Sequence, residues 1–115
     1  MNPQSDAPPI IEVYCSGSWI GFHRWPAAPT KVAYLADRHR HKFCWKVWWA
    51  VTHDDREIEF CSMQENIERQ IQWKIAHDDT TTWSCERWAL YLLDEFDAKR
   101  VEVNEDGENG SVVTR

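Results

Sequence analysis

The hydrophobic positions of the chain follow two different periods, which predict strands first and helices afterwards. β-branched and aromatic residues dominate 10–23 and 39–52, and a short alternating run follows at 57–60. Each segment is predicted to be a strand, the first interrupted by a bulge near Gly17. The polar residues at 53–56 indicate a turn, so we expect the second and third strands to pair as a hairpin.

Beyond residue 60 the apolar residues recur at helical spacing. In the first of two such segments they fall at every fourth position: Met63, Ile67, Ile71 and Ile75. This stripe predicts an amphipathic helix over about 63–76. Ser84 is a good N-cap for a second helix that ends near Asp97. Glu86 lies in its first turn, where the helix dipole favours an acid.

The remaining segments complete an α+β order. Turn-forming residues within 24–38 indicate a loop with a short ordered piece. After the helices, a strand over 99–105 is followed by a turn and a last strand to residue 115. The order β-β-β-α-α-β-β predicts a single α+β domain over 10–115 with an antiparallel sheet, after a disordered lead-in over 1–9.

Composition and charge restrict the kind of protein. Charged residues make up 28% of the chain and hydrophobic residues 43%, as in ordinary soluble domains. The net charge of −6 argues against nucleic acid as a partner, because phosphate binding needs a positive surface. No apolar stretch approaches the roughly 20 residues of a membrane helix, so we expect no membrane partner.

The cysteines and the first residues indicate the compartment. Cys15, Cys44, Cys61 and Cys85 include no CxxC pair of the kind found in zinc or redox motifs. The first ten residues are polar and rich in proline, unlike a secretory signal. We therefore expect reduced thiols in a cytoplasmic protein.

Eight tryptophans are unusual in a chain of 115 residues. Two interpretations remain open. Some of them line a pocket or a subunit contact, where aromatic side chains are enriched, or they are spread through the core and its rim. Trp45 and Trp49 share a strand face with two histidines and fit either interpretation.

Two histidines lie two residues apart at the start of the second strand. Side chains alternate along a strand, so His39 and His41 project from the same face. His23 ends the first strand and comes close to them if strands one and two pair as a long hairpin, whereas His53 lies at the far end. Three imidazoles form a zinc ligand set that leaves one position open. The alternative is a solvated basic segment, since the surrounding RHRHK is rich in charge.

These residues resemble the zinc-binding signature of the 6-pyruvoyl- and 6-carboxy-tetrahydropterin synthase family. In that family a His-Arg stretch after an aromatic residue precedes a His-Gly-His that opens the next strand. FHRW at 22–25 and HRHKFCWKV at 39–47 are similar to these two features. DREIEF at 55–60, SCERWALYLL at 84–93 and VEVNED at 101–106 resemble later features of the family, in the same order.

The resemblance implies a fold, a metal and a ligand. The fold is the tunnelling fold (T-fold), a four-stranded antiparallel sheet with two helices packed on one face, whose subunits form ring-shaped homo-oligomers. The implied cofactor is Zn²⁺, held by His23, His39 and His41. Glu105 is implied as the acid that anchors a pterin- or purine-like ring, with Glu86 as a second substrate-binding acid. From their surroundings alone, both acids also fit an ordinary helix start and a solvated turn.

The chain departs from the family at the groups that move protons. Arg40 replaces the glycine of His-Gly-His, and no cysteine stands just before that motif. The family's Asp-His pair after the first helix is represented only by His77 and Asp78, in reversed order. His77 and Asp78 are therefore the candidate catalytic residues.

Three functions fit these residues. The first is a zinc-dependent lyase of the pterin or deazapurine pathways, in which Zn²⁺ acts as a Lewis acid and Glu105 accepts hydrogen bonds from the ring. The second is a non-catalytic module that binds a pterin- or nucleotide-like ligand, which the missing cysteine and Asp-His pair favour. The third is a structural oligomer whose histidines are solvated.

Overall fold

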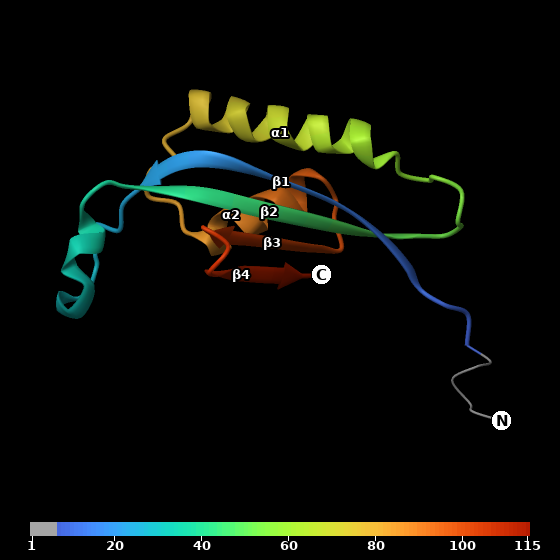
Figure 1. Ribbon diagram of the computed structural model, residues 1–115, viewed down its shortest axis with the longest axis horizontal. Helices are drawn as coiled ribbons and strands as arrows, with labels where there is room; N and C mark the ends of the chain where they lie inside the picture. Colours follow the sequence, from blue (N-terminus) through green and yellow to red (C-terminus); the bar gives the residue numbers. More distant parts are fainter. Residues whose placement is uncertain (1–6) are drawn as a thin grey trace.

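A four-stranded antiparallel sheet forms the centre of the protein (Figure 1). The computed structural model describes residues 7–115, so most of the expected lead-in, residues 1–6, lies outside the described residues. The elements follow in the order β1 (Ile11–His23), η2 (Thr30–Ala36, a 3-10 helix), β2 (His39–Val51), α1 (Phe60–His77), α2 (Cys85–Glu95), β3 (Arg100–Glu105) and β4 (Asn109–Thr114). The strands lie in the sheet in the same order, each antiparallel to its neighbour. This arrangement confirms the expected α+β class.

β1 and β2 form a long hairpin whose register determines the position of the histidines. The two strands have 13 residues each and pair one to one along their whole length, ending with His23 opposite His39. The bulge expected near Gly17 is therefore wrong. Gly17 lies opposite Trp45, and a Cβ atom at Gly17 would lie only 2.6 Å from the Trp45 ring. The glycine is needed because the buried indole packs against the backbone of β1.

The strand expected over 57–60 is wrong, because these residues lead into a helix. α1 begins at Phe60, and the carboxylate of Glu59 caps it by accepting hydrogen bonds from the main-chain N–H groups of Cys61 at 3.0 Å and Ser62 at 2.7 Å. The hydrogen bonds from Ser62 and Cys61 lower the pKa of Glu59 to about 2. The cap is therefore ionised at neutral pH, which suits the positive end of the helix dipole.

The elements after α1 agree with expectation. Ser84 caps α2 by accepting a hydrogen bond from the main-chain N–H of Arg87 at 3.1 Å. β3 and β4 are the two expected final strands, joined by a turn that ends at Asn109. η2 is the short ordered piece expected within the loop after β1. Among residues 7–115, no helix is long and apolar enough to cross a membrane.

The core lies on the side of the sheet to which the odd-numbered strand residues point. α1 contacts β1, and α2 contacts β3 and β4. The buried strand residues alternate in position with exposed or partly exposed neighbours: Cys15, Trp19, Phe43, Trp45, Val47, Trp49, Val101 and Val103. The helices contribute a second set of buried residues: Ile67, Ile71, Cys85, Trp88, Ala89, Leu92 and Leu93.

Most of the tryptophans belong to this core. Five of the eight are buried: Trp19, Trp45, Trp49, Trp83 and Trp88. Trp88 contacts both Trp19 and Trp83, with ring centroids 5.0 and 4.8 Å away. Trp25 and Trp73 are half exposed. The core thus takes up most of the aromatic excess, and few tryptophans are left for a surface role.

Candidate metal centre

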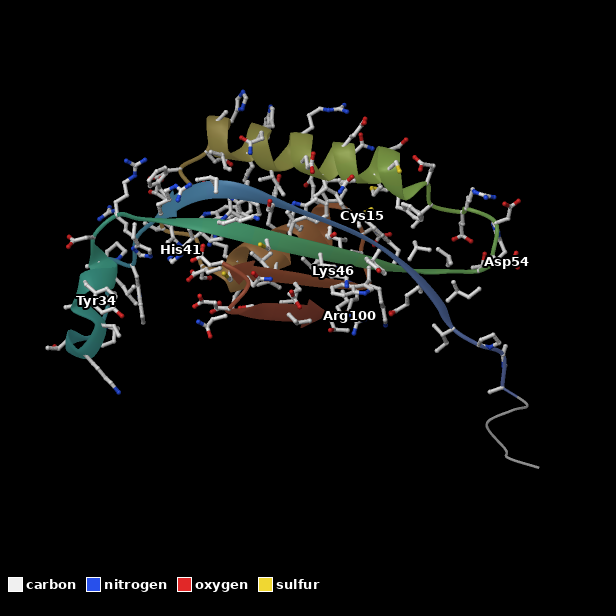
Figure 2. All side chains as sticks on the ribbon, in the orientation of Figure 1. Cys15, Tyr34, His41, Lys46, Asp54 and Arg100 are labelled. Atoms are coloured by element: carbon white, nitrogen blue, oxygen red, sulfur yellow. The ribbon has the colours of Figure 1, made fainter. Side chains whose placement is uncertain are left out.

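The hairpin register brings three histidines together at one end of the sheet. The ring centroids are 4.4 Å apart for His23 and His39, 4.9 Å for His39 and His41, and 5.2 Å for His23 and His41. One ring nitrogen of each lies within 4.8 Å of the other two. Figure 2 shows His41 near the end of β2 that joins η2, and Asp54 beyond the opposite end of that strand. His53 is accordingly remote from the cluster, as expected.

Main-chain carbonyl groups orient two of the three imidazoles. Nδ1 of His23 lies 3.2 Å from the carbonyl oxygen of Trp83, and Nδ1 of His39 lies 2.8 Å from that of Asp37. A carbonyl oxygen only accepts hydrogen bonds, so Nδ1 carries the proton in both residues. In the neutral ring the lone pair is then on Nε2, ready to bind a metal.

A carboxylate orients the third imidazole. Asp106 Oδ2 lies 2.7 Å from Nδ1 of His41, and Oδ1 accepts a hydrogen bond from the main-chain N–H of Lys42 at 2.8 Å. The hydrogen bonds from His41 and Lys42 lower the pKa of Asp106, which stays ionised. A carboxylate behind a metal-binding histidine fixes its tautomer and strengthens it as a ligand. Sequence reasoning missed Asp106, which is 65 residues from His41.

Burial favours the neutral form of the first imidazole. The side chain of His23 is only 13% exposed. Burial lowers the pKa of His23, an effect that the hydrogen bond to the Trp83 carbonyl and the charge of Glu105 oppose. Metal binding requires neutral imidazoles, so this environment suits a ligand.

A cavity of about 570 Å³ opens beside the histidines. Both acids that the resemblance implies as substrate-binding residues, Glu86 and Glu105, line it together with His23 and His39. Ser111 on β4 donates a hydrogen bond to Glu86 at 2.7 Å and so connects that strand to the start of α2. The apolar part of the wall includes Trp25, Leu35 and Trp83. A cavity of this size suits a small organic molecule.

Cys85 also lines this cavity, although its sequence position indicates only the apolar stripe of α2. Its Sγ atom lies 3.9 Å from Oε1 of Glu105. Burial, followed by the charges of Glu105 and Glu86, raises the pKa of the Cys85 thiol to about 12. The cavity therefore contains a protonated thiol. The position next to Glu86 in SCERW was the signal that could have identified it.

The two candidate catalytic residues lie in different surroundings. Asp78 pairs with Lys74 and lines a second cavity of about 340 Å³, which His23 also borders. His77 stacks on Trp73 with ring centroids 4.5 Å apart, and its Nδ1 lies 2.8 Å from the Trp73 carbonyl oxygen. His77 lines neither of these two cavities. The structure thus brings Asp78, but not His77, to a cavity that shares a metal-site histidine.

The donor set fits a zinc ion. Three imidazoles with oriented rings match the protein ligands of a zinc site that keeps a position for another group. A scan against protein-family models gives no match to the chain, and a search of curated proteins gives none either. The function is therefore argued from the geometry of this site.

Proposed function

We propose that the protein is a zinc-dependent lyase that acts on a pterin- or deazapurine-type molecule. The observation that carries the proposal is the histidine cluster: each Nδ1 atom faces an acceptor, and one nitrogen of each ring lies within 4.8 Å of the others. This pattern leaves three lone pairs for one cation. When bound, Zn²⁺ supplies a Lewis acid that polarises a carbonyl or hydroxyl group of the ligand.

We further propose that the architecture is a tunnelling fold with both helices on one face of the sheet. The shared parity of the buried strand residues supports this arrangement, as do the contacts of α1 with β1 and of α2 with β3 and β4. β1 and β4 are the edge strands, which suit pairing with further copies in a ring-shaped homo-oligomer. Four free thiols suit a cytoplasmic location.

The cavity beside the histidines supports the choice of ligand class. Trp25 and Trp83 offer flat apolar surface to a planar heterocycle. Carboxylates are suited to accept hydrogen bonds from neighbouring N–H groups of such a ring, and Glu86 and Glu105 both line the cavity. Asp78, in the second cavity bordered by His23, is the residue proposed to move protons, whereas His77 would need a rearrangement to take part.

Metal analysis of the purified protein tests the central part of the proposal. Wild type is expected to retain about one zinc per chain after dialysis, and His39→Ala and His41→Ala are expected to lose it. His53→Ala, at the far end of β2, is the matched control and should retain the metal. Equal zinc content in wild type and both site variants would contradict the proposal.

A turnover assay tests the chemistry. Zinc-loaded protein is incubated with dihydroneopterin triphosphate, and conversion is followed by the absorbance of the product. Conversion by wild type, and its loss in Asp78→Asn with zinc retained, is the expected result. No conversion by zinc-loaded protein that binds this compound would exclude the lyase for this ligand class.

The second candidate is a non-catalytic module that binds the same kind of ligand. The position of His77 favours it, because that side chain stacks on Trp73 and lines neither cavity. Ligand binding needs only the metal and the cavity, whereas turnover needs a placed proton-transfer group. Tight binding of a pterin without conversion is the result expected of this module.

A further inference from the structure

Glu105 faces two of the three histidines directly. Its Oε1 atom lies 3.2 Å from Nε2 of His23, and its Oε2 atom lies 3.4 Å from Nε2 of His41. Strand register explains this position, since Glu105 at the end of β3 lies opposite Phe43, two residues beyond His41 on β2. The thiol of Cys85 lies on a third side of the carboxylate, 3.9 Å from Oε1.

These contacts have no satisfactory hydrogen-bond account in neutral histidines. Nδ1 of His23 already donates its proton to the Trp83 carbonyl, so Nε2 of the neutral ring has a lone pair and no hydrogen. Nε2 of His23 and Oε1 of Glu105 are then two acceptors 3.2 Å apart. His41 has a carboxylate at each ring nitrogen, Asp106 at Nδ1 and Glu105 at Nε2. A cation shared by these atoms removes the conflict.

The spacing matches the edges of a tetrahedral zinc site. With zinc–nitrogen and zinc–oxygen bonds of about 2.0–2.1 Å, ligand atoms in a tetrahedron lie about 3.3–3.4 Å apart. The two distances from Glu105 to the histidine nitrogens, 3.2 and 3.4 Å, have this length. Carboxylate oxygen is an ordinary zinc ligand beside imidazole nitrogen.

We propose that Glu105 is the fourth protein ligand of the metal, so that the ligand-free centre is a closed site of three histidines and one glutamate. This inference rests on the proposed zinc site and changes the role of one residue in it. A carboxylate engaged by the metal is not free to anchor a ring. Glu86, held by Ser111 on the wall of the cavity, is then the acid left to accept hydrogen bonds from a bound heterocycle.

Competition with a chromophoric chelator near neutral pH measures the zinc affinity of wild type and Glu105→Gln. Glutamine has the same shape without the charge, and we expect the affinity to fall at least tenfold. Glu102→Gln is the matched control: Glu102 is on the same strand but has the opposite parity, and its carboxylate accepts from Asn104 instead. This control should keep wild-type affinity.

The visible spectrum of the cobalt-substituted protein separates a ligand from a nearby charge. Loss of a ligand changes the coordination shell, so Glu105→Gln and Glu105→Ala should each alter the cobalt bands. Added acetate should bind Glu105→Ala and return its spectrum toward wild type. Unchanged bands in both variants would overturn the inference, even if zinc affinity fell. Zinc binding by wild type in that experiment would leave the three-histidine site standing, whereas its absence would remove the proposed function as well.

Discussion

Replacing Asp106 with Asn perturbs the metal centre without touching a proposed ligand atom. In wild type the two carboxylate oxygens accept hydrogen bonds from Nδ1 of His41 at 2.7 Å and from the main-chain N–H of Lys42 at 2.8 Å. Asparagine has one oxygen and one NH₂ group, so it satisfies only one of these donors. With NH₂ toward His41, the imidazole must carry its proton on Nε2, and the lone pair needed by the metal is lost.

The expected effect is a fall in zinc affinity of about 10- to 100-fold, the usual result of losing such a supporting carboxylate. Chelator competition near neutral pH measures it, and metal-free unfolding curves check that the variant folds. Glu108→Gln removes one charge from the same turn but leaves the hydrogen bonds of His41 intact, so it controls for net charge. Equal affinities of wild type and Asp106→Asn would refute the argument that Asp106 determines the tautomer of a metal ligand.

Three further predictions concern stability and are measured by urea unfolding. Gly17→Ala places a Cβ atom 2.6 Å from the Trp45 ring and should cost about 1–3 kcal/mol, whereas Ser18→Ala on the exposed face should cost little; equal curves would contradict this packing. Leu92→Ala empties a fully buried position and should cost about 2–5 kcal/mol, and a smaller loss would mean that the core closes around the gap. Because the folded-state pKa of Glu59 is lowered from 4.5 to about 2, its capping contribution is fully present above pH 4.5 and is lost as pH falls toward 2. The stability difference between wild type and Glu59→Ala should therefore shrink over that range, and a constant difference would contradict the cap.

Local patterns were sufficient to predict the histidine cluster. His39 and His41 share a face because strand side chains alternate. His23 joins them because two long strands connected by one loop pair as a hairpin, and the observed register places it opposite His39. The Ser84 cap and the stripe of α2 are likewise local features, and both lie where the sequence predicts them.

Features that depend on competition between local structures, or on distant pairing, could not be predicted. The alternation in EIEF at 57–60 extends over only four residues, and the capping hydrogen bonds of Glu59 outweigh it. Asp106 reaches His41 only because β2 pairs with β3 in a register that the sequence does not reveal. The same pairing directs Glu105 at the histidines, a contact that neither strand pattern predicts alone.

Anomalous diffraction from a crystal of the zinc-loaded protein is the most direct test of the metal centre. Data collected on the two sides of the zinc absorption edge locate the ion without assumptions about its ligands. The account predicts one strong peak about 2.0–2.1 Å from a ring nitrogen of each of His23, His39 and His41. A zinc peak elsewhere in the molecule, with none between these three rings, would contradict it.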